Sequence, residues 1–161
     1  MTPRIDMTAT QTGAKLMKRF ANLHTVLQQS TLPVSTQELV SLRASQINGC
    51  APCVDMHTKE AAAAGESAVR LNLVAVWREA TVFTEAERAA LALVEEGTRL
   101  ADHHQGVSDE TWAQVRKHYD DEQITALVSL VGLINAANRM NVIVRNQGGS
   151  YEPGMLAAVA N

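Results

Sequence analysis

The sequence is poor in cysteine and in aromatic residues, and neither sign of charge is in large excess. Its 161 residues include two cysteines and 4% aromatic residues, and 14 lysines and arginines against 17 aspartates and glutamates give a net charge of −3. Two cysteines cannot build the disulfide scaffold of a small secreted protein. Because the basic residues form no stripe, we expect no binding to nucleic acid.

The sequence also lacks a secretory leader and an unbroken apolar run of membrane-spanning length. Residues Met1–Gly13 have no apolar core. The most apolar stretch, Ile124–Val144, is interrupted by four polar residues, which are Asn135, Asn138, Arg139 and Asn141. We therefore expect a soluble, cytoplasmic protein with no membrane contact. No linker divides the chain, so residues 1–161 are expected to form a single domain.

Apolar residues recur at intervals of three and four over most of the chain, which is typical of helices with one apolar face. No segment alternates with a period of two for long enough to predict a strand. We predict an all-α bundle of about six or seven helices. The predicted helices cover approximately residues 16–27, 36–47, 50–64, 69–77, 84–94, 112–119 and 124–144. The last of these is expected to be central, and residues Tyr151–Asn161 form an apolar end segment of a type that often packs on a neighbouring subunit.

Several helix ends are marked by short local signals. Ser35–Glu38 (STQE) and Thr84–Glu87 (TEAE) match the capping box, in which the first and fourth residues satisfy each other's backbone N–H groups. Asn48-Gly49 is a stop signal, after which a new helix starts. These signals predict a central αα-hairpin whose corner is Asn48–Pro52.

Both cysteines lie in the segment Cys50-Ala51-Pro52-Cys53, at the predicted start of the second helix of this hairpin. The partial positive charge of a helix start favours thiolate over thiol. Pro52 suits the first turn, where the missing N–H costs no helical hydrogen bond. Because Cys50 and Cys53 are three residues apart, their side chains can face each other closely enough for a reversible disulfide.

His57 and Glu38 are candidate proton-handling residues beside this pair. His57 follows Cys53 by four residues and shares its helix face, so its imidazole can exchange a proton with the thiol. Glu38 lies about 15 Å before the hairpin corner and His57 about 9 Å after it, at 1.5 Å per residue. A glutamate side chain spans that offset, which predicts a Glu38–His57 hydrogen bond that orients the ring.

Each of these residues also has an ordinary structural interpretation. Glu38 is explained by the capping box alone, and a histidine on a helix is most often a solvated or satisfied side chain. The segment C-x-x-C-x-x-x-H supplies three zinc ligands, to which His103, His104 or His118 is a candidate fourth. A second pair of ligands of the kind that structural zinc sites use is missing from the sequence, so we expect no metal site. His103 and His104 are expected in a polar loop.

The spacing of Glu38, Cys50, Cys53 and His57 resembles the alkylhydroperoxidase D-like core of the carboxymuconolactone decarboxylase-like family. The stretch QELVSLRASQINGCAPCVDMHTKEAAAAG is similar to that core, and FTEAERAALALVEEGTRL and LINAANRMNVIVR are similar to later family segments. The resemblance covers the chain from about Gln37 to Arg145.

This resemblance implies an all-α fold, assembly into homo-oligomers, and thiol-dependent reduction of hydroperoxides without a cofactor. By position, Cys53 is the thiolate that attacks the peroxide, Cys50 the resolving thiol, and Glu38 and His57 the proton relay. An external dithiol or thiol protein is the implied electron donor. Where the best-known peroxidase members carry a further histidine, this chain has Pro52. The decarboxylase members lack the cysteine pair, so its presence argues against decarboxylation.

Two further functions use the same residues. A general dithiol–disulfide oxidoreductase would exchange electrons through Cys50 and Cys53 without turning over peroxide. A non-catalytic, oligomeric helical module would use the pair as a redox sensor or a zinc clip.

Overall fold

The structure, a computed structural model, describes residues 2–160, and every regular element in that range is a helix. In chain order the elements are α1 (Gln11–Gln28), α2 (Val34–Asn48), α3 (Ala51–Ala63), α4 (Ala68–Leu73), the 3₁₀ helix η1 (Val74–Val76), α5 (Glu85–Thr98), the 3₁₀ helix η2 (Leu100–Asp102), α6 (Asp109–His118), α7 (Asp121–Val144) and α8 (Met155–Ala160). The predicted all-α fold is confirmed. The described range holds eight α-helices, because the apolar end segment forms the short helix α8.

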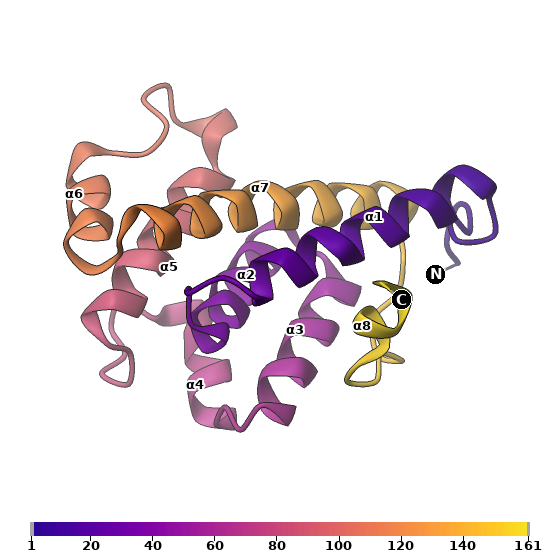
Figure 1. Cartoon of the computed structure of the whole chain (residues 1–161), viewed down its shortest axis with the longest axis horizontal. Helices are drawn as coiled ribbons and strands as arrows, with labels where there is room; N and C mark the ends of the chain where they lie inside the picture. Colours follow the sequence, from indigo (N-terminus) through magenta and orange to yellow (C-terminus); the bar gives the residue numbers. More distant parts are fainter. Residues whose placement is uncertain (1, 161) are drawn as a thin grey trace.

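Helix α7 is the central element, as predicted. Figure 1 shows α7 and α1 running along the length of the molecule, and α2, α3 and α5 also pack against α7. Leu127, Leu130 and Ile134 are buried in the core that these helices share. By length and composition alone α7 would also suit a membrane span. In this fold its buried apolar side chains form the surface on which the other helices pack.

Buried amides tie the end of α2 to α7. Asn48 Nδ2 lies 2.9 Å from both Asn135 Oδ1 and Asn138 Oδ1, and Asn138 Nδ2 donates to Ser45 Oγ at 3.1 Å. Asn138 is fully buried. Two of the polar residues that interrupt the apolar stretch therefore fix the hairpin corner against the central helix, since a buried amide is stable only with its partners in place.

The hairpin corner has the predicted position. Gly49 adopts a left-handed conformation, with φ of 65°, and ends α2. The N–H of Cys50 then bonds the carbonyl of Ser45 at 3.0 Å, and α3 begins at Ala51. Glycine suits this corner because the left-handed region is strained for residues with a Cβ. The cysteine pair is thus carried on a tight, fixed turn.

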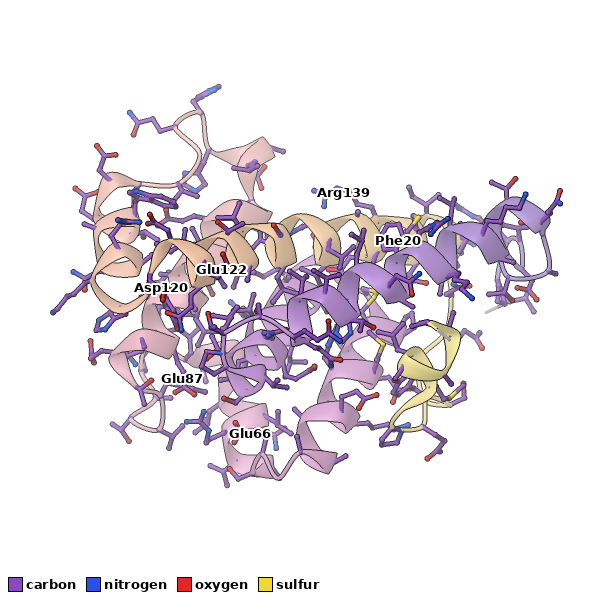
Figure 2. The ribbon with its side chains drawn as sticks, viewed as in Figure 1. Phe20, Glu66, Glu87, Asp120, Glu122 and Arg139 are labelled. Carbon is purple, nitrogen blue, oxygen red and sulfur yellow. A yellow bond between two sulfur atoms is a disulfide. The ribbon has the colours of Figure 1, made fainter. Side chains whose placement is uncertain are left out.

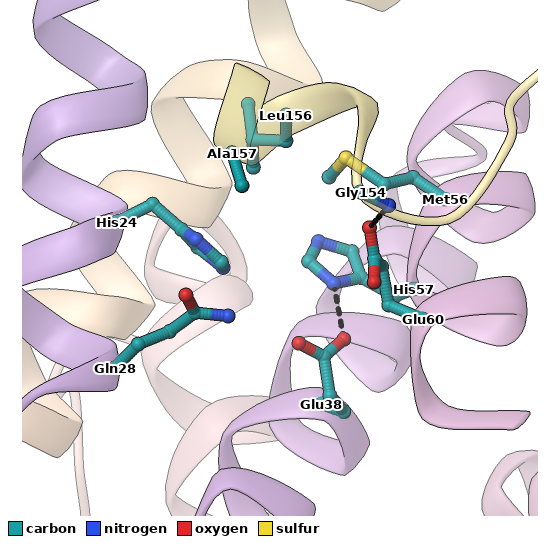
Figure 3. A pocket seen from close by; sticks show the side chains of 9 residues that line it. All are labelled: His24, Gln28, Glu38, Met56, His57, Glu60, Gly154, Leu156 and Ala157. Carbon is teal, nitrogen blue, oxygen red and sulfur yellow. Dashed lines mark hydrogen bonds and ion pairs between the residues drawn. The ribbon is translucent and has the colours of Figure 1, made fainter. Parts of the chain in front are cut away.

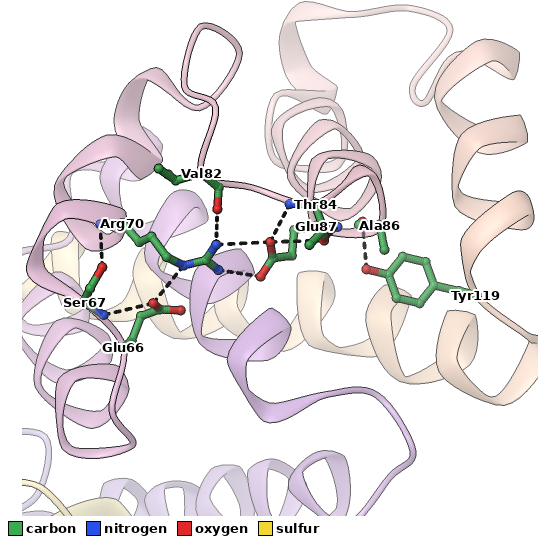
Figure 4. Close-up of polar contacts among 8 residues, drawn as sticks. All are labelled: Glu66, Ser67, Arg70, Val82, Thr84, Ala86, Glu87 and Tyr119. Carbon is green, nitrogen blue, oxygen red and sulfur yellow. Dashed lines mark hydrogen bonds and ion pairs between the residues drawn. The ribbon is translucent and has the colours of Figure 1, made fainter.

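Two helices begin with complete capping boxes. The predicted box of Thr84 and Glu87 at the start of α5 is confirmed, and Asp120 and Gln123 form a second one at the start of α7, near the label of Asp120 in Figure 2. The Glu87 carboxylate also accepts a hydrogen bond from Arg70 of α4, as Figure 4 shows. One side chain therefore caps α5 and holds α4 against it.

The capping box predicted at Ser35–Glu38 is wrong. Helix α2 begins two residues earlier than predicted, at Val34, and its N-cap residue Pro33 makes no side-chain capping bond. Proline fits there because its φ of −54° suits a helix start and its missing N–H would have no helical partner. The Glu38 carboxylate is left available for another contact.

The apolar side chains of α1 are only partly buried, and the end segment packs within its own chain. Leu16, Leu23 and Val26 of α1 are exposed, whereas Leu27 is buried. Helix α8 packs on α1 of its own chain, and Figure 1 shows it below the N-terminal half of that helix. The end segment, which we expected to pack on a neighbouring subunit, therefore packs on α1 of its own chain.

A buried carboxylate on α5 positions α2. Glu95 Oε1 accepts hydrogen bonds from Arg43 of α2 at 2.7 Å and from Trp77 at 3.0 Å, and Glu95 Oε2 accepts one from Arg78 at 2.8 Å. Burial alone would raise the pKa of Glu95, but the hydrogen bonds from Trp77, Arg43 and Arg78 outweigh it and hold the pKa below its usual value.

The lowered pKa of Glu95 predicts a pH-dependent contribution to stability. A carboxyl group with a lowered pKa in the folded state stabilises the fold above its unfolded pKa, and this stability is lost as the pH falls through the folded pKa. Glu95→Gln should lower the free energy of unfolding by about 1–3 kcal/mol at pH 7, and the gap to wild type should shrink below about pH 4. Urea unfolding across this range measures it. The exposed Glu79→Gln is the control, and a gap independent of pH would contradict the prediction.

Candidate active site

The two cysteines lie at the start of α3 and are joined by a disulfide. Cys50 is the N-cap residue and Cys53 lies in the first turn, with their Sγ atoms 2.14 Å apart. Both residues are buried. Pro52 occupies the first turn, as predicted. The helix start and the pairing of the two sulfurs agree with the sequence analysis, and the structure holds the oxidised state of the pair.

Cys53 has a polar neighbour that sequence reasoning missed. Asn141 Nδ2 on α7 donates to Cys53 Sγ at 3.4 Å, and Asn146 Nδ2 in turn donates to Asn141 Oδ1 at 2.7 Å. The second bond fixes which way the Asn141 amide faces. An N–H directed at sulfur favours the thiolate when the pair is reduced, because it stabilises the negative charge. The available signal was the position of Asn141 as a polar interruption of the apolar helix.

Glu38 and His57 form the predicted hydrogen bond between α2 and α3. The distance from His57 Nδ1 to Glu38 Oε2 is 2.8 Å, and the two residues are 2% and 4% exposed. Figure 3 shows the two side chains facing each other. Since a carboxylate accepts the Nδ1–H bond, a neutral imidazole carries its lone pair on Nε2. His57 Nε2 is buried and has no hydrogen-bond partner within residues 2–160.

Cys53 and His57 are not hydrogen-bonded to each other in the part of the chain that the structure describes. The expected proton exchange between them therefore needs a bridging oxygen, from a water molecule or a substrate. Both residues line the same cavity, so a bridging oxygen has access to both. The geometry supports proton transfer between Cys53 and His57 through a bound molecule. The direct contact between these two residues that the helix spacing suggested is not made in the disulfide state.

An apolar cavity of about 360 Å³ lies over these residues, between α1, α3, α7 and the C-terminal segment. All five methionines within residues 2–160 line it, namely Met7, Met17, Met56, Met140 and Met155. Its other apolar lining residues include Phe20, Leu133, Ile134, Ala137 and Leu156. Thioether side chains adapt to apolar molecules of different shapes. Nothing in the sequence predicted this cavity, because its lining residues come from segments that lie far apart in the chain.

The C-terminal segment forms the roof of the cavity and is held by acidic residues of α3. Asp55 Oδ2 accepts from the backbone N–H of Gly149 at 2.6 Å and of Tyr151 at 3.0 Å. Glu60 accepts from the Tyr151 hydroxyl and from the N–H of Gly154. Burial and the bond to Glu60 raise the pKa of Tyr151, so its phenol stays protonated and donates. Helix α3 thus carries both the cysteine pair and the groups that hold the roof.

The histidines considered as zinc ligands do not join the cysteines in one site. Within residues 2–160, no group of three or more His, Cys, Asp or Glu side chains is placed to hold a metal ion. His103 and His104 are exposed in the loop after η2, which agrees with the predicted polar loop. The zinc-clip interpretation therefore has no ligand cluster in the described chain.

Known proteins similar to this chain share its helical architecture. Residues 14–96 match the model of the carboxymuconolactone decarboxylase family. The uncharacterized protein YdfG of Bacillus subtilis (strain 168) is 37% identical over 134 residues, which cover 83% of this chain and 90% of that protein.

Two solved structures illustrate the range of functions attached to this fold. ATU0492 from Agrobacterium tumefaciens, a protein of unknown function provisionally named as the antioxidant defence protein AhpD, has a TM-score of 0.84 and 38% identity, covering 93% of this chain and 100% of its own. The debrominase Bmp8 has a TM-score of 0.69 at 17% identity, covering 88% of this chain and 73% of its own. At that identity the second likeness shows the fold alone.

Proposed function

The chain belongs to the carboxymuconolactone decarboxylase family, and within it we propose that this protein is a thiol-dependent peroxidase that reduces hydroperoxides through Cys50 and Cys53. One observation carries the proposal. The cysteine pair lies at a helix start, and Cys53 lines the same apolar cavity as His57, whose ring is hydrogen-bonded to the buried Glu38. The family includes enzymes, and the provisional antioxidant name of the Agrobacterium relative agrees with this proposal.

In the oxidative step, the Cys53 thiolate attacks the terminal oxygen of the hydroperoxide. The O–O bond breaks, an S–O bond forms, and the sulfur loses two electrons to become sulfenic acid. The departing alkoxide takes the proton held on His57 Nε2 and leaves as an alcohol. Glu38 stabilises the protonated ring through Nδ1, and the Asn141 amide stabilises the thiolate before attack.

In the resolving step, the Cys50 sulfur attacks the Cys53 sulfenic acid. An S–S bond forms, the S–O bond breaks, and the hydroxyl leaves as water after taking up the Cys50 proton. The product is the disulfide that the structure contains. An external dithiol or thiol protein then reduces it by thiolate exchange, which returns two electrons to the pair and needs no cofactor.

A cytoplasmic location and assembly into homo-oligomers belong to the same proposal. Reducing conditions in the cytoplasm supply the thiols that the cycle consumes. The exposed side chains of Leu16, Leu23 and Val26 on α1 give an apolar face on which a second copy of the chain can pack.

Trapping the intermediate tests the assignment of the two cysteines. In a Cys50→Ser variant treated with cumene hydroperoxide, sulfenic acid should accumulate on Cys53, because its resolving partner is gone. Dimedone labelling followed by peptide mass spectrometry measures it. Cys53→Ser should consume no hydroperoxide. Oxidation of Cys50 in Cys53→Ser at the wild-type rate would contradict the assignment, and rapid exchange with dithiols without any reaction with peroxide would favour a general oxidoreductase.

The apolar cavity predicts a preference for organic hydroperoxides over hydrogen peroxide. A large side chain at Ala137, which lines the cavity, should fill the space needed by the organic group. We expect Ala137→Phe to lower kcat/KM for cumene hydroperoxide at least tenfold, about 1.4 kcal/mol, and to change kcat/KM for hydrogen peroxide much less. Ala136→Phe, at an exposed position of the same helix, is the matched control. Equal losses for both peroxides would show that the cavity does not select the substrate.

A further inference from the structure

A second, smaller cavity of about 50 Å³ borders His57 on the side of α1. Figure 3 shows His24 and Gln28 of α1 pointing across it towards the His57 ring, with Glu60 beside His57 and Leu156 on α8. His24 and Gln28 are four residues apart, so they share one face of the helix. A polar cavity of this size is large enough for a water molecule with several hydrogen-bond partners.

The atom that faces this cavity without a partner is His57 Nε2. His57 is 2% exposed, and Nε2 has no hydrogen-bond partner within residues 2–160. A buried polar nitrogen without a partner costs free energy, and such atoms are almost always satisfied by protein or by water. The polar side chains across the cavity are placed to share a water molecule with it.

His24 is the titratable group on the opposite wall. Burial lowers its pKa, the carboxylates of Glu38 and Glu60 oppose that shift, and the charge of His57 adds to it. The C-terminal segment adds Gly154 and the apolar side chains of Leu156 and Ala157 to the lining, and α3 adds Met56. An imidazole in this setting is neutral near pH 7 and both accepts and donates a proton.

We propose that a water molecule in this cavity bonds His57 Nε2, and that His24 passes protons between that water and the solvent. His24 is half-buried and lines both cavities, so it stands between the buried ring and the outside. The inference rests on the proposed peroxidase function. It adds a proton path through α1 that returns a proton to His57 Nε2 after the departing alkoxide has taken one from it.

The proton balance of the cycle shows where such a path is needed. In the oxidative and resolving steps, both thiol protons leave with the alcohol and the water. In the reductive step, each donor thiol is deprotonated before its thiolate attacks the disulfide or the mixed disulfide. The enzyme takes up two protons in return, one on Cys50 and one on His57 beside the Cys53 thiolate. In the proposed path, solvent accepts the donor protons and supplies the His57 proton through His24.

Replacing His24 tests the path. We compare two rates of cumene hydroperoxide reduction, the steady-state rate with dithiothreitol and the rate of one turnover of pre-reduced protein. His24→Gln should slow the first about tenfold more than the second, which is a typical effect of losing an acid–base group. The pH dependence of turnover should change with it. His24→Ala should behave alike and recover rate when imidazole is added. His103→Gln, in the exposed loop, is the control for histidine loss.

The outcomes separate this inference from the function on which it rests. If pre-reduced wild-type protein fails to consume cumene hydroperoxide, the proposed function falls. If wild type reacts but His24→Gln turns over like wild type at every pH, only the proton path is overturned. The proton path is also overturned if His24→Gln loses the same fraction of its rate in single and multiple turnover and imidazole does not restore the rate of His24→Ala. That pattern would mark a structural role for His24.

A measurement on the unaltered chain keeps the test independent of variant folding. A crystal structure of the wild-type protein at high resolution should show an ordered water within hydrogen-bond distance of His57 Nε2, with His24 or Gln28 as its second partner. If the His57 ring instead turns to bond a protein group at Nε2, the path is absent.

Discussion

The buried hydrogen bond between Glu38 and His57 is the contact on which the candidate site depends. It joins α2 to α3 across the hairpin, sets the tautomer of the imidazole, and directs Nε2 away from the carboxylate. The surrounding structure keeps this bond in place. Glu95 holds α2 against α5 through Arg43, and Asn138 holds the end of α2 against α7 through Ser45. The positions of the two helices therefore fix the positions of the two reactive side chains.

The cavity and its roof show how this family fold makes a site from distant segments. Helix α3 carries the cysteine pair, and its Asp55 and Glu60 also hold the C-terminal segment that closes the cavity. Cys53 therefore lies at a tight corner of the chain and lines a cavity that is rich in methionine side chains.

Local signals in the sequence were sufficient to predict the α2–α3 hairpin and part of the candidate site. Asn48-Gly49 predicted the corner, and helix geometry brought Glu38 to His57. The box at Ser35 failed because α2 begins at Val34, after Pro33, and because the Glu38 carboxylate bonds His57 instead of the helix start. Asn141, His24 and the roof were missed for a different reason. Their roles come from packing between segments that lie far apart in the chain, and a period of 3.6 residues does not report such packing.

The central claim is that Cys53 transfers two electrons to a hydroperoxide and that Cys50 then closes the disulfide. The most direct measurement mixes the fully reduced protein, without any external thiol, with excess cumene hydroperoxide, and counts the alcohol formed against the Cys50–Cys53 disulfide formed. We expect one alcohol for each disulfide, in a single rapid burst. Disulfide formation without alcohol, or no loss of thiols at modest peroxide excess, would contradict it.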